Sequence, residues 1–461
     1  MQRLLNNKFV MACLTWLITR FARRPLRLLL PVHFRDSSLW STDLPTVQLV
    51  IGSSREVVQR VLIRGAAQYP KSRVMQPLLC PLIGRGLFAS EHPDVATIRR
   101  MFIRAIAQVD DQTIVATSER LLDEYRGRWR DEGTLERLPV SSEMSRLTVD
   151  IVSECLFRTR FTAAESAEFT LLFFRYQFQA SPLRLFPWVG TKVFAPVRQA
   201  RQMRIAVRMR ELMRAQFVTA LRDPSSPAAS SPFALAVAER ERAGESPLSD
   251  ERLLDEVAVM LLAGHETSAS ALSWLLRELA CDTDLQRRLR QDILQAGETA
   301  SRAGAETSLV RSVINEVLRL YPPIPLYARD AASSDTLEDT PIRRGAMILV
   351  PSWVIHRHAS LWDDPGSFKP DRFLSLSASD TSTRFLPFGS GPRACPGSRF
   401  AMAEMQALVG GIVRAFQLRP LAGRAAQPLG NLTTRPDREI HVTLDPLAVG
   451  DAGGVSSDPP S

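Results

Sequence analysis

The stretch from Phe385 to Gly397 constrains the fold of this chain more than any other. It reads Phe-Leu-Pro-Phe-Gly-Ser-Gly-Pro-Arg-Ala-Cys-Pro-Gly and contains Cys395, one of only five cysteines. Gly389 and Gly391 predict a tight, irregular loop, because glycine reaches positive φ at little cost. Pro396 then predicts a helix start, since the first helical residue needs no backbone donor. Cys395 is therefore expected at a loop-to-helix junction, where the positive helix end favours a thiolate over a thiol.

A cysteine held in this way could act as a nucleophile or a metal ligand, although an isolated cysteine is most often a small buried residue. The flanking residues decide between these roles. The pattern Phe388-x-x-Gly391-x-Arg393-x-Cys395-x-Gly397 resembles the haem-binding loop of the cytochromes P450, with every fixed position filled. The resemblance implies that the Cys395 thiolate is the axial ligand of haem iron, which favours O–O cleavage. It also implies that Phe388 packs near the sulfur and that Arg393 pairs with a haem propionate.

A long helix is predicted from Ser249 to about Cys281, and its middle is almost wholly apolar. The sequence Ala263-Gly264-His265-Glu266-Thr267-Ser268 interrupts that middle with residues that are costly to bury in a helix. This segment resembles the oxygen-binding groove of the same family. The resemblance implies that Glu266 shuttles protons and that Thr267 donates to or orients bound dioxygen.

The other residues of this groove have simpler expected roles. The small residues Ala263 and Gly264 are expected to leave room for haem and oxygen, and His265 is expected to be incidental. The alternative for Thr267 is ordinary packing, with its hydroxyl bonded back to a backbone carbonyl.

Two further arginines are expected to bind haem propionates. A helix is predicted from Asp94 to Ala107, where the family usually carries Trp-x-x-x-Arg. Val95 and Arg99 stand at these positions, so the tryptophan is absent and the choice between Arg99 and Arg100 stays open. Arg329, at the start of a predicted extended segment, is the second expected partner.

Other local patterns predict structure rather than chemistry. Glu316-x-x-Arg319 resembles the family's buried pair, whose third member would be Arg372, and His356 is expected to be structural. Residues 81–90 are predicted to form a glycine-punctuated loop. Residues 430–436 and 440–444 are predicted to form a closing hairpin.

Composition narrows the class of protein. With 45% hydrophobic and 23% charged residues, the 461-residue chain is typical of a globular protein. The cysteines contain no close pair, which argues against a disulfide framework or a zinc cluster and favours a reducing compartment; we expect a cytoplasmic protein. The net charge of +9 comes from scattered arginines. Because no basic block is interleaved with aromatic residues, nucleic-acid binding is not expected.

Three segments are predicted along the chain: an apolar and basic N-terminal segment (1–39), a cytochrome P450 domain (40–447) and a disordered tail (448–461). Within the first, the apolar run from Phe9 to Thr19 is too short for a membrane span, which needs about 20 residues. Arginines follow it in place of a cleavage site. We expect an amphipathic first helix with at most peripheral membrane contact.

These patterns predict a mainly α fold with small β sheets, in which haem lies between the long central helix and the helix that follows Cys395. The resemblance implies a haem-thiolate monooxygenase that uses haem b and dioxygen to hydroxylate an apolar small molecule. No flavin or ferredoxin module is recognisable, so electrons from NAD(P)H are expected to arrive indirectly, through an acidic ferredoxin or flavodoxin with its reductase. We expect a monomer.

Two other functions remain open from the sequence. One is a haem-thiolate isomerase or dehydratase that rearranges a peroxide, although such relatives often lack the acid–alcohol pair present here as Glu266 and Thr267. The other is a non-enzymatic haem-binding protein, in which a complete oxygen-activation groove would be superfluous.

Overall fold

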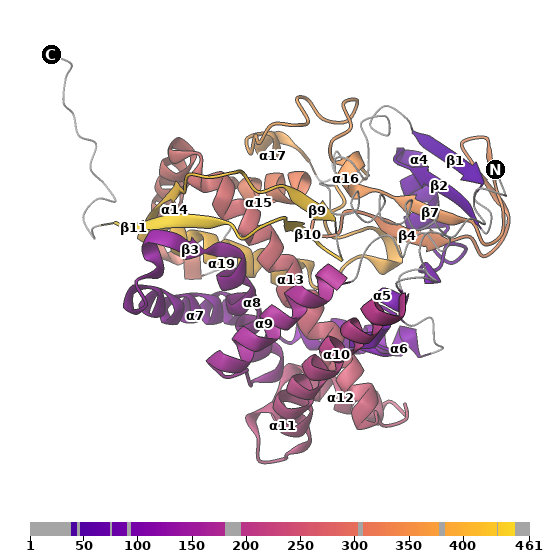
Figure 1. Cartoon of the computed structure of the whole chain (residues 1–461), viewed down its shortest axis with the longest axis horizontal. Coiled ribbons are helices and arrows are strands. Elements are labelled where there is room, and N and C mark those ends of the chain that lie inside the picture. The colour runs from indigo at the N-terminus through magenta and orange to yellow at the C-terminus, as the bar shows by residue number, and fades with distance from the viewer. Residues whose placement is uncertain are drawn as a thin grey trace.

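The computed structural model describes residues 38–43, 47–73, 76–89, 94–179, 195–302, 308–377, 383–430 and 432–447. The predicted tail lies outside these residues, as does nearly all of the predicted N-terminal segment. The described chain is mainly helical with several small sheets, which confirms the predicted fold class (Figure 1). No helix in these ranges is both long and apolar enough to cross a membrane.

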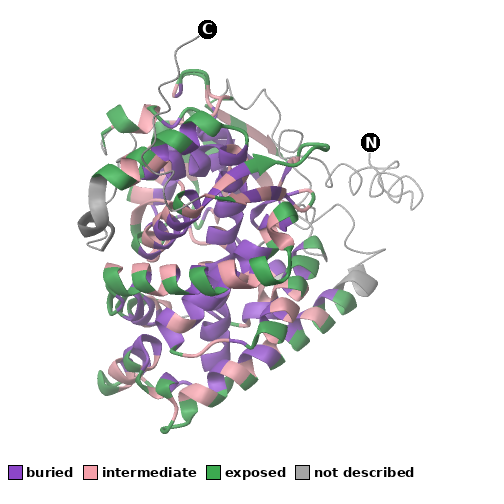
Figure 2. Cartoon of the chain, turned by 90° about the vertical axis from the view of Figure 1, so that its left-hand side faces the viewer, coloured by how far each residue is buried: buried purple, intermediate pink, exposed green. Residues whose placement is uncertain are grey.

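Helix α13 (Asp250–Ala280) runs through the centre of the molecule. Its start confirms the prediction: the Ser249 side chain accepts a hydrogen bond from the backbone N–H of Arg252 at 3.2 Å and so caps a helix whose first turn is acidic. It packs most extensively on α8 (Val140–Phe157). Most of its residues are buried, and Figure 2 shows the buried residues gathered in the interior while exposed residues face outward.

The remaining helices surround this core. Along them, apolar residues recur at the helical period that the sequence predicts. The longer ones are α6 (Val95–Ala107), α7 (Asp111–Asp131), α9 (Ala163–Gln179), α10 (Ala195–Met213), α12 (Pro232–Arg242), α14 (Thr283–Arg302), α15 (Ser308–Leu320) and α19 (Ser398–Ala415). The shorter ones are α4 (Arg55–Val57), η2 (Val58–Arg64), α5 (Gln76–Ile83), η4 (Thr134–Arg137), η6 (Arg214–Val218), α11 (Thr219–Arg222), η7 (Pro227–Ser230), α16 (Ser352–Ile355), α17 (Arg372–Ser375) and η8 (Gly391–Arg393).

The largest sheet described has four strands in the order β1 (Leu39–Asp43), β2 (Gln48–Gly52), β7 (Met347–Val350) and β4 (Tyr327–Asp330). Strands β2 and β7 are parallel, and the other neighbours are antiparallel. Arg329 is on β4, opposite Ile348. Smaller sheets join β5 (Asp335–Leu337) with β6 (Thr340–Ile342), β9 (Pro428–Gly430) with β10 (Thr434–Pro436), and β3 (Leu138–Pro139) with β11 (His441–Pro446) and β8 (Phe416–Pro420).

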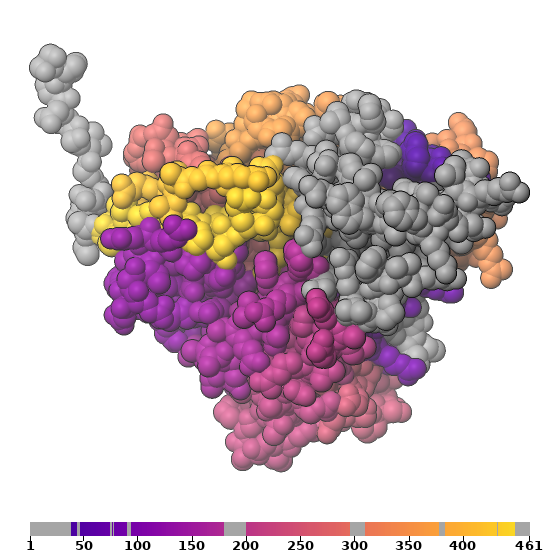
Figure 3. Space-filling view, viewed as in Figure 1, coloured from indigo at the N-terminus to yellow at the C-terminus, as the bar shows by residue number. Residues whose placement is uncertain are grey.

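Two local predictions are wrong. Residues 76–83 form α5 with Pro81 inside it, so part of the predicted 81–90 loop is helical. Leu82 and Ile83 pack into the main core, and this burial outweighs the helix-breaking effect of proline. The predicted closing hairpin is also wrong, because β10 pairs with β9 whereas β11 pairs with β8 and β3. The C-terminal strands thereby lie against the helices near residue 140, as Figure 3 shows from the same side.

Candidate active site

A cavity of about 620 Å³ lies between α13 and the loop that carries Cys395. Most of its lining is apolar. The polar or chemically active side chains among its lining residues are Lys71, Ser72, Gln76, Arg99, Tyr176, Glu266, Thr267, Ser268, Tyr327, Arg329, Ser390, Arg393, Cys395 and Thr433. The predicted site residues Ala263, Phe388 and Gly397 also line it, so the structure brings all the residues expected from the sequence to one cavity.

The loop before Cys395 adopts the predicted tight conformation. Gly389 and Gly391 have φ of 71° and 72°. At Gly391 a Cβ atom would lie 2.1 Å from the Leu62 carbonyl oxygen, so the loop needs glycine there for close approach as well as for its backbone angle. The N–H of Cys395 donates to the Phe388 carbonyl at 2.8 Å. Helix α19 begins three residues later, at Ser398 with Gly397 as its N-cap. The predicted loop-to-helix junction is therefore present, but Pro396 lies in the turn before the helix and is not its first residue.

The surroundings of the Cys395 sulfur act on its pKa in opposite directions. Cys395 has accessible surface toward the cavity, but protein encloses most of the residue, and this desolvation raises the pKa of its thiol. The backbone N–H of Gly397 and the charge of Arg99 lower it. The expected stabilisation of a thiolate by the helix start is therefore present, but desolvation is the larger effect in the protein alone.

Arg99, rather than Arg100, belongs to the cavity. Arg99 lines it and donates from Nη2 to the Ala394 carbonyl at 2.6 Å, whereas Arg100 is exposed. Burial lowers the pKa of the Arg99 guanidinium, although the nearby Cys395 opposes this. Arg393 donates from Nη1 to the Ala66 carbonyl at 2.6 Å, so part of its hydrogen-bonding capacity holds the fold.

Lys71 is a cation that the sequence did not single out. It forms a β-bridge with Arg329 and lines the same cavity, and its Nζ donates to the Leu87 carbonyl at 2.6 Å. A lone lysine outside any motif carries no local signal, which is why only the structure finds it.

The charges of the cavity fit an iron porphyrin. Its cationic lining residues are Lys71, Arg99, Arg329 and Arg393. Among the lining residues, all of which belong to the described ranges, Glu266 is the sole acid. Partly buried cations around an apolar cavity favour an anionic ligand. The two propionates of a porphyrin match this charge, and Cys395 would supply an iron ligand.

Thr267 and Ala263 lie on the cavity side of α13. The Thr267 hydroxyl donates back to the Ala263 carbonyl at 2.7 Å, as in the packing alternative, while the side chain still lines the cavity. Gly264 also lines the cavity, and it has a second reason to be small. A Cβ atom there would meet Val152 of α8 at 2.8 Å, so its lack of a side chain allows α13 and α8 to pack closely.

Glu266 is fully buried and held by three partners that sequence reasoning missed. Its Oε1 lies 2.7 Å from Nε of Arg435, and it accepts from Nε2 of Gln177 at 2.8 Å and from the Thr433 hydroxyl at 2.7 Å. Its Oε2 has no hydrogen-bond partner among the described residues. A buried carboxylate predicts a cationic partner, but nothing in the sequence identifies which of the 58 lysines and arginines it is.

His265 and His356 have structural surroundings, as expected. His265 is buried beside Phe169 and Phe173, with Nδ1 2.8 Å from the Leu261 carbonyl oxygen, and is not among the cavity-lining residues. Burial lowers the pKa of the His356 imidazole to about 3. The neutral ring accepts at Nε2 from the N–H of Leu386 at 2.7 Å and so supports the loop before Cys395.

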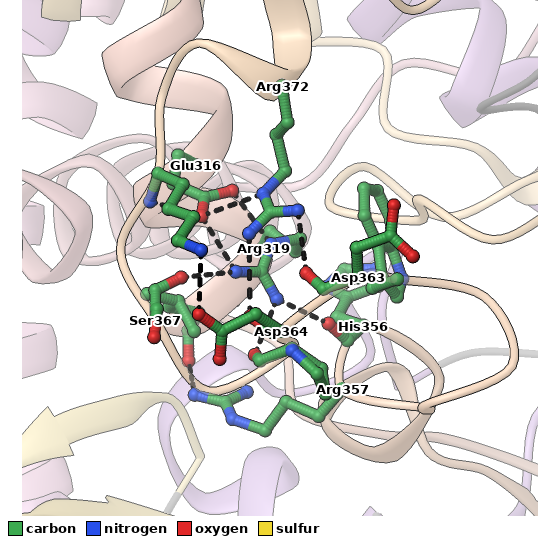
Figure 4. A network of polar contacts seen from close by, with 12 residues as sticks. Glu316, Arg319, His356, Arg357, Asp363, Asp364, Ser367 and Arg372 are labelled. Atoms are coloured by element: carbon green, nitrogen blue, oxygen red, sulfur yellow. Dashed lines mark hydrogen bonds and ion pairs between the residues drawn. The ribbon is translucent and has the colours of Figure 1, made fainter.

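The Glu316 pair and Arg372 also meet as expected (Figure 4). Arg372 Nε lies 3.1 Å from the Glu316 carboxylate, whose side chain is fully buried. These residues do not line the cavity. They fasten α15 to the segment around 365–372, consistent with the structural role predicted for them.

Comparison with known proteins decides the family. The model of the Cytochrome P450 family matches residues 7–443, which is nearly the whole chain. The chain belongs to the cytochrome P450 family. It is a cytochrome P450 monooxygenase, and membership of the family implies a haem cofactor.

Similar curated P450 proteins come from distant organisms. The chain is 28% identical over 435 residues to cyclooctatin synthase of Streptomyces melanosporofaciens, with 91% of each chain covered. It is 28% identical to Cytochrome P450 4X1 of Mus musculus, with 82% of this chain and 78% of the mouse protein covered. It is 26% identical to cytokinin hydroxylase of Arabidopsis thaliana, with 89% and 80% covered.

Proposed function

We propose that this P450 hydroxylates an apolar small molecule, with Cys395 as the iron ligand and Arg99, Arg329 and Arg393 as partners of the haem propionates. The observation that supports this most directly is that the Cys395 sulfur and the Glu266–Thr267 pair open onto one cavity. The mostly apolar lining suits a substrate with little polar surface. The names of two relatives, cytokinin hydroxylase and cyclooctatin synthase, are compatible with hydroxylation of small molecules.

Each site residue has a distinct proposed task. When bound, haem supplies the activation of dioxygen. Phe388 and Gly397 flank the thiolate, and the Gly397 N–H lowers the pKa of Cys395. Ala263 leaves open space at the cavity face of α13. The carboxylate of Glu266 is fixed through Oε1, so Oε2 is the atom at which it holds and passes on a proton, and Oγ1 of Thr267 relays that proton into the cavity.

Electrons are proposed to come from NAD(P)H through a separate acidic ferredoxin or flavodoxin with its reductase. Arg99 links α6 to the Cys395 loop, and the exposed Arg100 and Arg104 continue the same helix. Arg399 lies just after the loop on α19. Arg104 also pairs with Glu239, and Arg399 with Asp111, but both arginine side chains stay exposed to solvent. Such a basic face would attract an acidic redox partner. The rate of electron transfer from that partner should fall as salt is added, because salt screens the attraction.

The direct test is spectroscopic. Dithionite-reduced enzyme treated with carbon monoxide should show the thiolate-ligated band that gives the family its name, and Cys395→Ser should lose it. Cys155→Ser, a buried cysteine outside the cavity, is the matched control and should keep the band. Survival of the band in Cys395→Ser would assign the ligand elsewhere. Substrate-dependent NADPH consumption with a ferredoxin and its reductase then tests the monooxygenase reaction in solution.

A further inference from the structure

Two consecutive carboxylates of α13 hold the backbone of one cavity wall. The N–H of Arg85 donates to Oδ2 of Asp255 at 2.9 Å, and the N–H of Leu87 donates to Oε2 of Glu256 at 3.1 Å. Both carboxylates are buried, with Glu256 fully so. We call residues 85–89 the wall segment, because Leu87, Phe88 and Ala89 line the cavity. Two buried carboxylates therefore accept hydrogen bonds from the backbone that lines the proposed substrate-binding cavity.

The wall segment approaches α13 more closely than side chains would allow. Gly84 has φ of 51°, and a Cβ atom there would lie 2.0 Å from Oδ1 of Asp255. At Gly86 a Cβ atom would lie 2.5 Å from Cγ2 of Val259. Glycine at both positions lets the backbone reach the carboxylates directly.

The backbone carbonyls of the wall segment also accept hydrogen bonds from side chains. The Leu87 carbonyl accepts from Nζ of Lys71 at 2.6 Å, and the Ala89 carbonyl accepts from Nε2 of Gln76 at 3.2 Å. Nη1 of Arg252 donates to the Arg85 carbonyl. The segment is thus fixed by polar contacts from both sides.

Each carboxylate has an arginine beside it. Arg252, one turn before Glu256 on α13, lies 2.9 Å from Oε1 of Glu256. Arg210 of α10 lies 2.8 Å from Oδ1 of Asp255. Burial raises the pKa of Glu256 to about 7, and the charge of Arg252 opposes this shift. The wall segment is thus anchored to carboxyl groups that have cationic neighbours and do not themselves line the cavity.

We propose that Asp255 and Glu256 are positioning residues that hold the wall segment against α13 and thereby set the shape of the cavity and its selectivity for ligands by size. The anchoring is inferred from the contacts alone. Its effect on substrates rests on the proposed function, in which the substrate binds in this cavity. Loosening either carboxylate frees Leu87 and Phe88 to move outward, which admits larger ligands while small ligands are little affected.

Hydrogen–deuterium exchange of the haem-loaded enzyme measures the anchoring without any substrate. In Glu256→Met, which removes the acceptor, the amides of residues 85–89 should exchange about tenfold faster, as expected for loss of a hydrogen bond to a charged group. Glu256→Gln, which keeps an acceptor but loses the charge, should give a smaller increase. Glu251→Gln is the matched control: this carboxylate is on the same helix and also pairs with Arg210, but is largely exposed and does not contact the wall segment.

Ligand-entry rates test the consequence for the cavity. Binding of imidazole and of 4-phenylimidazole to the haem iron is followed by stopped-flow absorbance. Glu256→Met should speed entry of 4-phenylimidazole about tenfold while changing that of imidazole less than about twofold. Asp255→Asn, which keeps an acceptor, should favour the larger ligand in the same way but to a smaller degree. Asp255→Asn keeps the test available if Glu256→Met does not fold.

Equal exchange in Glu256→Met and the unmodified enzyme, or equal acceleration of both ligands in Asp255→Asn, would overturn the proposal. Failure of the proposed function would look different. It would leave the exchange and ligand-entry differences intact while substrate-dependent NADPH consumption was absent.

Discussion

Glu316 and Arg319 lie one turn apart on α15 with both side chains fully buried, and each carboxylate oxygen accepts a guanidinium hydrogen bond of 2.7 Å. This parallel pairing uses the planar fork of arginine, which lysine could not reproduce. The other donors of Arg319 reach backbone carbonyls of His356, Pro365 and Ser367 (Figure 4). Two sequence-local residues thus organise a loop region some 40 to 50 residues further along the chain.

Replacement of Glu316 by Gln should strongly destabilise the enzyme. The change leaves Arg319 and Arg372 without their carboxylate, and removing one partner of a buried ion pair costs about 3–5 kcal/mol. Urea denaturation followed by the haem absorbance measures the loss. Asp371→Asn, which breaks the exposed pair with Arg288, should cost less than about 1 kcal/mol. Similar midpoints for the two variants would contradict the structural role of Glu316.

Replacement of Thr267 by Ala should uncouple oxygen use from product formation. The Thr267 hydroxyl is the proposed proton relay between Glu266 and the cavity, and its removal leaves the cavity otherwise intact. Oxygen uptake should continue while hydrogen peroxide rises and product per NADPH falls. Thr267→Ser, which keeps the hydroxyl, should restore most of the coupling. Unchanged coupling in Thr267→Ala would remove this residue from proton delivery.

The parts of the site that the sequence predicted are set by local chemistry. The Cys395 junction follows in large part from Gly389, Gly391 and Pro396, whose backbone preferences are local. The start of α13 follows from the cap at Ser249. In such segments neighbouring residues decide the conformation, and the sequence alone predicts it.

The parts that the sequence missed depend on contacts between distant residues. Arg435 and Gln177 meet at Glu266 although they are far apart in the sequence, and neither belongs to a recognisable motif in its own segment. Strand β11 pairs with β8 in an arrangement that buries Val442 in the core. Turn residues in the sequence do not indicate this pairing. At Gly264 the sequence correctly predicted that a small residue is needed. Its packing neighbour, Val152, can be identified only from the fold.

The stability of the protein should depend on pH through Glu404 of α19. Burial raises the pKa of this carboxyl to about 8 from 4.5, while the Ser268 hydroxyl weakly opposes the shift. Between these values the folded protein holds a proton that the unfolded chain has released, so the free energy of unfolding falls as pH rises from about 4.5 to 8. Above pH 8 this contribution no longer changes.

Glu404→Gln removes that dependence and should therefore stabilise the enzyme more at pH 8 than at pH 5. Thermal unfolding of the two proteins at both pH values measures the difference. Glu119→Gln, at a more exposed carboxylate paired with Arg414, serves as control and should show no comparable pH-dependent gain. An equal effect of Glu404→Gln at pH 5 and pH 8 would show that the carboxyl has an ordinary pKa.

Pro396, immediately after Cys395, should keep the reduction potential of the haem iron low. Backbone N–H groups near the sulfur stabilise its negative charge and tune the potential. Gly397 supplies such a hydrogen bond here, whereas proline has no N–H to add a second one. With fewer hydrogen bonds more charge stays on the sulfur, which favours ferric over ferrous iron.

Pro396→Ala should therefore raise the potential, provided that the new N–H reaches the sulfur. A hydrogen bond to a charged group is worth about 1.5–3 kcal/mol, but only its difference between the two iron states counts. At roughly 59 mV per 1.4 kcal/mol for one electron, a differential of about 1 kcal/mol gives on the order of 40 mV. Spectroelectrochemical titration without substrate measures the change. Pro392→Ala makes the same chemical change earlier in the loop and should leave the potential unaltered. An unchanged or lower potential in Pro396→Ala with intact thiolate ligation would show that the missing donor does not set the potential.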